Sequence, residues 1–150
     1  MTSYQLSSAV RSPGRSITFL EFSPNGRFLA VGDRGLSSLS ILDKCTGYHP
    51  NLSTTMPAEP RALVWDASEA FYVGLGDGCF IHCQIDHERN DIVKGAVNSA
   101  LYGVFPVTAI ALHQGSNILA VSVGPEVFLF QRARTTSGFT CNYIASMNLC

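Results

Sequence analysis

The 150-residue chain has few charged residues and no excess of either sign. Only 14% of its residues are charged, against about 25% in an average globular protein. Its 11 acidic and 10 basic side chains nearly cancel. Such a chain has no long-range attraction to nucleic acid or to an anionic membrane surface. We therefore expect neither a nucleic-acid partner nor a membrane partner.

Long apolar runs are also missing. The longest mostly apolar segment, 100–112, contains Pro106 and Thr108, and it is shorter than the about 20 residues of a membrane-spanning helix. The first six residues lack the basic region and apolar stretch of a signal peptide. Five scattered cysteines, an odd number, fit reduced thiols better than a secreted disulfide framework. These observations predict a cytoplasmic protein, with the nucleus as the alternative location.

Signatures of common hydrolases and nucleotide-binding proteins are absent from the sequence, since it has neither a Gly-x-Ser-x-Gly elbow nor a Gly-Lys-Ser/Thr phosphate loop. Gly74, Gly76 and Gly78 have the spacing of a phosphate loop. No helical pattern follows them, so we interpret them as a hairpin turn. The histidines are dispersed, at His49, His82, His87 and His113. We predict no catalytic residue and no cofactor.

One group of residues suggests a metal site. Cys79 and Cys83 lie close in sequence to His82 and His87. On a strand, however, the two cysteines point to one face and His82 points to the other. A structural zinc site also needs a second ligand pair, and the sequence has none. We therefore interpret the cysteines as core residues and predict no metal site.

Two further charged segments are candidates for binding. Arg132 and Arg134 follow Phe128 and Phe130, a combination that could bind nucleic acid through charge and stacking. We interpret both arginines as part of a solvated connector after a strand. The mixed-charge segment 86–91 is interpreted in the same way, as a solvated surface loop.

The sequence does contain a repeated pattern of short strands and tight turns. Each unit has a short strand, a polar turn, a second apolar strand and a third strand, and the units lie at approximately 16–43, 61–86 and 107–131. Phe22, Trp65 and Leu112 set their register and are 43 and 47 residues apart. Asn25 and Gly26 supply the positive φ that a tight turn between antiparallel strands requires.

A fourth strand in each unit is less distinct. The candidate segments are 4–9, 52–56, 93–101 and 140–147. With them, each unit becomes a four-stranded antiparallel meander, whose outermost strand precedes the innermost strand of the next unit.

These units resemble the WD-repeat β-propeller family, whose repeats of about 40–45 residues form four-stranded blades. The resemblance covers residues 16–131 and is best in the first unit, where Leu42-Asp43 stands at the family's terminal Trp-Asp position. No Gly-His dipeptide precedes a unit, and Trp65-Asp66 ends a first strand instead of a third. The family's buried polar network is therefore incomplete, and we expect the stability of the blades to come mainly from apolar packing between neighbours.

The resemblance implies an all-β fold, a partial β-propeller of about three four-stranded antiparallel blades within a single domain, 1–150. Because a closed propeller has at least about four blades, the two end blades are expected to expose apolar surface. The chain is then a fragment of a longer propeller, a shortened gene product or half of an assembled ring.

The function implied by the resemblance is that of a non-catalytic scaffold or adaptor. Its partners would be other proteins or peptides, bound by rim loops or by the exposed end blades, with self-association to complete a ring. No binding residue is assigned, but the loops near Arg34, Asp77 and Glu126 lie at one expected set of hairpin tips and are the first to mutate. The alternatives are a propeller-type enzyme and a truncated fragment without independent function.

Overall fold

The structure is a computed structural model that describes residues 3, 16–99, 105–135 and 138–148. The described residues form strands joined by turns, with one 3-10 helix, η1, at Lys44–Thr46. None of these residues belongs to a helix long and apolar enough to cross a membrane. The candidate outer strand at 4–9 lies outside the described residues.

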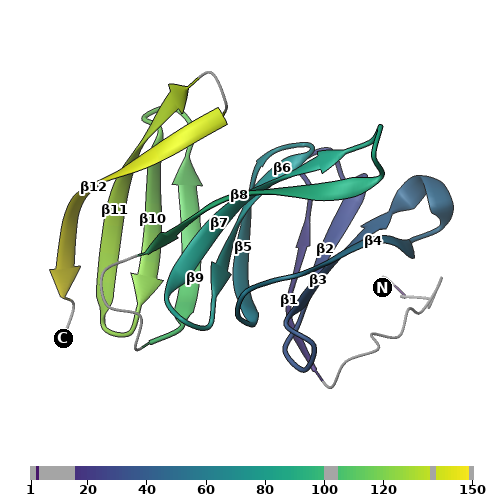
Figure 1. Cartoon of the computed structure of the whole chain (residues 1–150), viewed down its shortest axis with the longest axis horizontal. Coiled ribbons are helices and arrows are strands. Elements are labelled where there is room, and N and C mark those ends of the chain that lie inside the picture. The colour runs from purple at the N-terminus through teal and green to yellow at the C-terminus, as the bar shows by residue number, and fades with distance from the viewer. Residues whose placement is uncertain (1–2, 4–15, 100–104, 136–137, 149–150) are drawn as a thin grey trace.

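Three antiparallel sheets of four strands each make up the fold (Figure 1). We call them blades 1, 2 and 3. Blade 1 consists of β1 (Ile17–Phe22), β2 (Phe28–Asp33), β3 (Ser38–Asp43) and β4 (His49–Thr55). Blade 2 consists of β5 (Pro60–Ala67), β6 (Ala70–Leu75), β7 (Cys79–Asp86) and β8 (Asp91–Ser99). Blade 3 consists of β9 (Val107–His113), β10 (Ile118–Val123), β11 (Glu126–Thr135) and β12 (Gly138–Asn148).

Each blade is a meander in which every strand pairs with the next one along the chain. The predicted all-β fold of three four-stranded antiparallel blades is thus confirmed. The fourth strands β4, β8 and β12 overlap the candidate segments 52–56, 93–101 and 140–147, of which residues 100 and 101 lie outside the described part of the chain. In each blade the first strand is innermost, and β5 lies between β1 and β9 (Figure 1).

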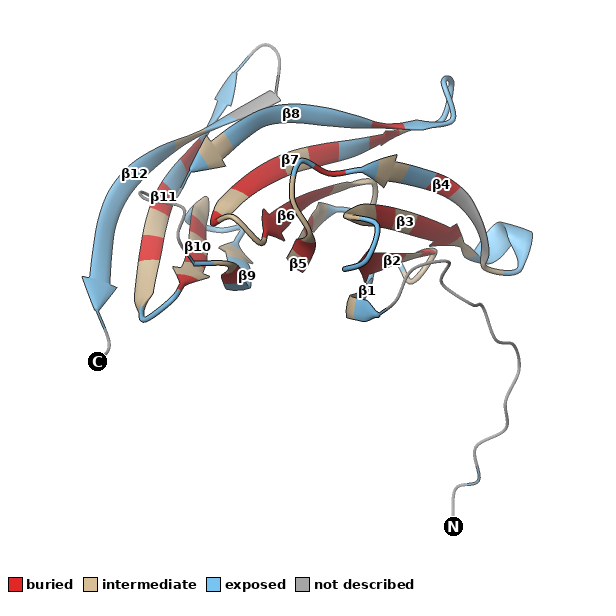
Figure 2. Ribbon diagram, turned by 60° about the horizontal axis from the view of Figure 1, so that its bottom comes forward, coloured by how far each residue is buried: buried red, intermediate tan, exposed pale blue. Residues whose placement is uncertain are grey.

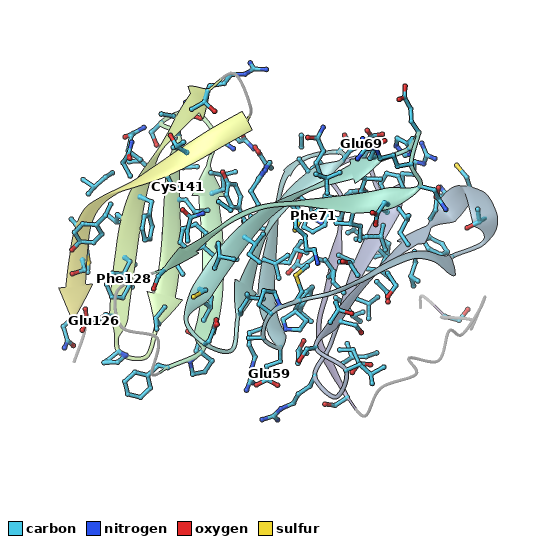
Figure 3. The ribbon with its side chains drawn as sticks, viewed as in Figure 1. Glu59, Glu69, Phe71, Glu126, Phe128 and Cys141 are labelled. Atoms are coloured by element: carbon cyan, nitrogen blue, oxygen red, sulfur yellow. The ribbon has the colours of Figure 1, made fainter. Side chains whose placement is uncertain are left out.

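The turns lie along two rims. We call the rim that carries the β1–β2, β5–β6, β7–β8 and β9–β10 turns the upper rim, and the opposite one the lower rim. Glu69 lies on the upper rim, whereas Glu59 and Glu126 lie on the lower rim (Figure 3). A typical upper turn follows β1, where Gly26 has a φ of 72° and the backbone N–H of Phe28 donates to Ser23 Oγ at 3.0 Å.

The apolar core lies between the blades, in two clusters (Figure 2). The first joint, between blades 1 and 2, buries side chains such as Phe28, Ile41, Trp65 and Phe71. The second joint, between blades 2 and 3, buries a smaller cluster that includes Tyr72, Phe80, Leu119 and Phe130. Blade 2 is therefore covered on both sides, and its strand β6 is buried along almost its whole length.

Neighbouring residues of a strand serve different joints because side chains alternate between the two faces of a sheet. We call the face of a blade toward the preceding blade its front face and the other its back face. Phe71 is on the front face of blade 2 and packs in the first joint, whereas the next residue, Tyr72, is on the back face and packs in the second.

Candidate functional site

The upper rim of blade 2 has a hollow beside the first joint. Its volume is about 410 Å³. The turn after β5 and the segment from the end of β7 into β8 form its walls, through Glu69, Gln84, Ile85, Asp86, His87, Glu88 and Val93. Three of these side chains are carboxylates, so the hollow is acidic. It is an open surface feature whose lining also includes two apolar side chains, Ile85 and Val93.

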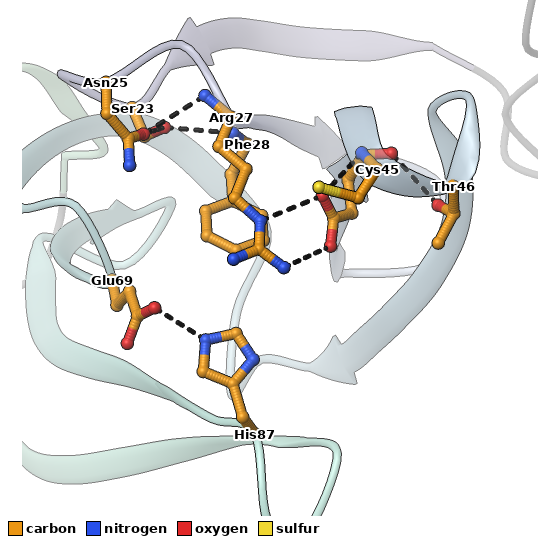
Figure 4. Close-up of polar contacts among 9 residues, drawn as sticks. Ser23, Asn25, Arg27, Phe28, Cys45, Thr46, Glu69 and His87 are labelled. Carbon is orange, nitrogen blue, oxygen red and sulfur yellow. Dashed lines mark hydrogen bonds and ion pairs between the residues drawn. The ribbon is translucent and has the colours of Figure 1, made fainter.

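His87 links the hollow to blade 1. Its Nε2 lies 2.6 Å from Glu69 Oε1, and its ring stacks on Phe28 with the centroids 6.1 Å apart. The guanidinium carbon of Arg27 lies over the Phe28 ring, 4.7 Å from its centroid. The guanidinium of Arg27 also pairs with Asp43 at 3.0 Å (Figure 4). These contacts fix the wall of the hollow between two blades.

The pairing of Arg27 with Asp43 shifts the pKa of both groups. The hydrogen bond from Arg27 lowers the pKa of Asp43 below its usual range. The same hydrogen bond raises the pKa of Arg27. Asp43 Oδ1 also accepts from the backbone N–H of Cys45 at 2.9 Å, which caps η1. A charged side chain at Asp43 therefore orders both the turn after β3 and the upper rim beside the hollow.

A buried polar network joins blades 2 and 3. Asp66 Oδ1 lies 2.5 Å from Arg132 Nη1, and Asp66 Oδ2 lies 3.2 Å from His82 Nε2. Gln114 donates to the backbone carbonyl of Asp66 and accepts from Arg132 Nη2 at 3.2 Å. The ring of Tyr72 packs on that of His82, with the centroids 4.7 Å apart.

Burial and polar contacts have opposite effects on the pKa of Asp66. Burial alone would raise the pKa of Asp66, but its contacts with His82 and Arg132 outweigh that effect and lower the pKa to about 2. Burial is also the main reason why the pKa of Tyr72 is raised. Because Asp66 belongs to blade 2 and Arg132 to blade 3, their ion pair holds the second joint together.

One expectation from the sequence is corrected by this network. Arg132 is not part of a solvated connector, because β11 continues to Thr135 and Arg132 is buried beside Asp66. The second joint thus contains an ion pair in addition to its apolar cluster. Arg134, two residues further, is exposed as expected.

The burial of Arg132 could have been predicted from its spacing in the sequence, two residues after Phe130 and four after Phe128. Phe128, Phe130 and Arg132 are all buried, whereas Gln131 is exposed. A period of two therefore places Arg132 on the same face as the two phenylalanines. Asp66 is 66 residues away in sequence, and no local pattern identifies it as the partner.

The cysteines of β7 belong to the first joint. Cys83 is buried in its core, and Cys79 packs against that core. Burial raises the pKa of the Cys83 thiol to about 12, which keeps it protonated. His82 lies on the opposite face, toward Asp66 and Tyr72. Among the described residues, no three His, Cys, Asp or Glu side chains come together to hold a metal ion.

Gly74, Gly76 and Gly78 lie at a hairpin, because β6 ends at Leu75 and β7 begins at Cys79. Gly78 has a φ of 85°, the left-handed conformation that such a turn requires. The segment 86–91 forms the β7–β8 turn, where Asp86 Oδ1 accepts from the backbone N–H groups of Glu88 and Arg89. This turn is part of the hollow, which the sequence did not indicate.

The structure places the three loops singled out in the sequence on the lower rim. Arg34 pairs with Glu59 at 3.1 Å across the first joint, and Glu59 also pairs with Arg61. Asp77 Oδ1 accepts from the backbone N–H of Cys79 at 3.1 Å. Glu126 lies at the start of β11, half-buried. These loops share a rim, but it is the rim opposite the hollow.

No protein-family profile and no curated protein sequence matches the chain. Solved structures do. Sqt1 from Chaetomium thermophilum matches over 88% of this chain and 35% of its own, with 15% identity and a TM-score of 0.68. A second structure of Sqt1 is bound to the N-terminus of ribosomal protein L10 (TM-score 0.62, 16% identity, 77% of this chain and 33% of that one).

Two other structures have the same arrangement of blades. The periplasmic gluconolactonase PpgL of Pseudomonas aeruginosa matches over 89% of this chain and 41% of its own, with 16% identity and a TM-score of 0.70. The mitotic checkpoint complex contributes a match over 71% of this chain and 33% of its own (15% identity, TM-score 0.60).

The matched proteins are β-propellers, and the chain spans about a third to two fifths of their length. At these identities the likeness shows the fold alone. The chain therefore has the fold of a partial β-propeller, with three four-stranded blades.

Proposed function

We propose that the chain works as a non-catalytic protein-interaction module of the WD-repeat type, a scaffold or adaptor of the cytoplasm or nucleus. The observation that carries this proposal is the hollow of about 410 Å³ on the upper rim, built from two turns of blade 2 and backed by blade 1. Its lining combines charged side chains with Ile85 and Val93. Such a surface suits a peptide segment of another protein.

Two of the propellers with this fold support the proposal by analogy. Sqt1 is seen with the N-terminus of ribosomal protein L10 bound, and another match is part of the mitotic checkpoint complex. A chain terminus or loop of a partner is small enough for a hollow of this size. By the same analogy, the rim loops of this chain are the contact surface.

The charge of the hollow indicates the chemistry of the partner. Glu69, Asp86 and Glu88 contribute carboxylates to its walls, and Arg89 lies 3.8 Å from Asp86. A partner segment with lysine, arginine or a free N-terminus would complement these acids. Ile85 and Val93, the apolar residues of the lining, would contact a neighbouring aliphatic side chain of the same segment.

The test is a selection from a random peptide library against the purified chain, followed by affinity measurements on the selected peptides. Basic peptides are expected to dominate. Glu88→Lys, on the wall of the hollow, is expected to weaken their binding about tenfold, or about 1.4 kcal/mol. Asp77→Lys makes the same charge change on the lower rim and is expected to leave binding unchanged. Equal effects of both substitutions would contradict the rim site.

The end blades give the second mode of binding in this proposal. Leu20 and Phe22 of β1 are exposed, as is Met147 of β12. These strands belong to blades 1 and 3, the two blades that have a neighbour on one side only among the described residues. Self-association through the end blades would complete a ring.

An enzyme is the alternative function, because PpgL is a gluconolactonase with the same fold. Lactone hydrolysis by the purified chain, or a stoichiometric metal found by mass spectrometry, would overturn the scaffold proposal. Neither activity nor metal is expected.

A further inference from the structure

The two end blades each present an open face. In the described part of the chain, the front face of blade 1 and the back face of blade 3 have no blade packed against them. Both joints within the chain follow one rule, in which the back face of a blade packs on the front face of the next. One front face, that of blade 1, and one back face, that of blade 3, therefore remain uncovered.

The front face of blade 1 carries the same kinds of side chain as a front face that is already covered. Leu20 and Phe22 correspond to Leu63 and Trp65, which lie 43 residues further along the chain. The correspondence also holds in the sheet, where the four residues pair with Val31, Leu29, Val73 and Phe71, respectively. Leu20 and Phe22 are 57% and 58% exposed, whereas Leu63 and Trp65 are 5% and 8% exposed. Leu63 and Trp65 are covered by blade 1, whereas no blade of the described chain covers Leu20 and Phe22.

The back face of blade 3 likewise matches the back faces that are covered. The covered back faces contain large side chains, such as Phe28 and Ile41 in blade 1 and Tyr72 and Phe80 in blade 2, together with a few small residues. Ala30 of blade 1 is fully buried at the first joint, and a Cβ on Gly74 of blade 2 would overlap with the side chain of Val107. In blade 3, Ala120, paired with Ala111, stands at the position of Ala30, and Ser122, paired with Ala109, stands at the position of Gly74. The back face of blade 3 is therefore small at the same two positions.

We propose that a second copy of this chain covers both open faces. The back face of blade 3 in each copy packs on the front face of blade 1 in the other copy. Because both contacts are of the same kind, the two copies form a closed two-fold ring. Its six blades fall within the about four to eight of closed propellers.

A second copy is favoured as the occupant because it supplies a front face and a back face at the same time. A partner of another kind would have to match two different faces, one at each end of the chain. This ring is a specific form of the self-association included in the proposed function, and it rests on that part of the proposed function. Peptide binding at the upper rim holds or fails independently, since the hollow lies on neither open face.

The first experiment measures the mass of the purified full chain by light scattering over a range of concentrations. The expected mass is that of two copies of a 16.2 kDa chain. A monomer at every concentration would overturn the proposal, because two exposed apolar faces would then remain open beside an available second copy.

The second experiment places a charge on each open face. Phe22→Glu alters the front face of blade 1, and Ala111→Glu alters the back face of blade 3. Both residues are exposed in the single chain, so each variant is expected to keep the circular dichroism spectrum and to become a monomer. Leu36→Glu is the matched control, because Leu36 is 53% exposed in the β2–β3 turn, away from both faces. It is expected to remain a dimer.

Mixing the two charged variants tests which faces meet. In a ring built front to back, one joint of the mixed dimer carries both substitutions and the other carries none. The mixture is therefore expected to recover dimers, with weaker affinity than the unaltered chain. A dimer that joins two front faces would leave Ala111→Glu fully dimeric, and one that joins two back faces would leave Phe22→Glu dimeric. Either result would overturn the proposal.

Discussion

At the scale of single residues, the second joint depends on one buried ion pair. The side chains of Arg132 and Asp66 are only 3% and 8% exposed. A charge in such a place is stabilised by its partner and becomes costly when the partner is removed. The pair ties β11 of blade 3 to the end of β5 in blade 2, so its loss acts on the contact between blades.

Arg132→Met is expected to lower the free energy of unfolding by about 3–5 kcal/mol, because it leaves the Asp66 carboxylate buried without its cation. The double variant Arg132→Met, Asp66→Asn is expected to be more stable than the sum of the single effects predicts, since no charge is then left uncompensated. Urea denaturation at a fixed protein concentration measures all three variants. Arg134→Ala, an exposed arginine on the same strand, is the control and should stay within about 0.5 kcal/mol of the unaltered chain.

The same carboxylate makes stability depend on acid. The pKa of Asp66 is about 2 in the folded chain and 3.8 as an ordinary aspartate. Its contribution is complete above about pH 4 and is lost as the pH falls toward 2, because the folded state then has to take up a proton that breaks the pair. Thermal unfolding between pH 5 and pH 2 should show this loss. Asp66→Asn should flatten the profile in that range.

Single-residue features that depend on local backbone conformation could be predicted from the sequence, whereas contacts between blades, such as that of Arg132, could not. The turn after β1 was predictable because its requirement for a positive φ is local, although Gly26 alone meets it and Asn25 does not. The pairing of Arg132 with Asp66 was not, because it arises only when two blades meet. The rim hollow also needed the structure, since Glu69 and the β7–β8 turn are neighbours only after β5 to β8 have folded into a sheet.

At the scale of elements, the close contact of β6 with β9 at the second joint depends on a small residue, Gly74, in the back face of blade 2. Strands and blades could be predicted from apolar segments separated by turn residues, which recur at a regular spacing. The closeness of the blades at the joints could not be predicted, because it depends on the particular side chains that meet when two blades pack together. Gly74 shows this well, since Val107 of β9 occupies the space where its Cβ would be.

Gly74→Ala is expected to destabilise the chain by about 1–3 kcal/mol, because the added methyl group overlaps with the buried side chain of Val107. The double variant Gly74→Ala, Val107→Ala should recover part of this loss. Gly115→Ala provides the control, because a Cβ there meets only the ring of His113, an exposed side chain. Thermal denaturation of the four proteins would show whether overlap at the joint is the cause.

At the scale of the whole molecule, stability is distributed over two joints and not concentrated in one centre. Blade 2 takes part in both, and its strands β6 and β7 contain many fully buried side chains, including Phe71, Val73 and Phe80. Blades 1 and 3 each contribute to one joint only within the described chain. A repeat structure of this kind depends on contacts between neighbours.

Hydrogen exchange is therefore expected to be slowest in β6 and β7 and faster in β12, whose described side chains are mostly exposed. The measurement should use the Phe22→Glu variant, so that self-association does not protect the end blades. Slowest exchange in blade 3 would contradict the central place of blade 2. In the unaltered chain, protection of blades 1 and 3 should rise with concentration.

Trp65, the single tryptophan of the chain, gives the first joint an optical label of its own. Its ring lies 5.0 Å from that of Phe71, and its Nε1 donates to the backbone carbonyl of Glu21 at 3.1 Å across the joint. Tryptophan fluorescence therefore reports on blades 1 and 2 and is silent about blade 3. If blade 3 separates first, circular dichroism will change while the emission spectrum stays that of the native chain.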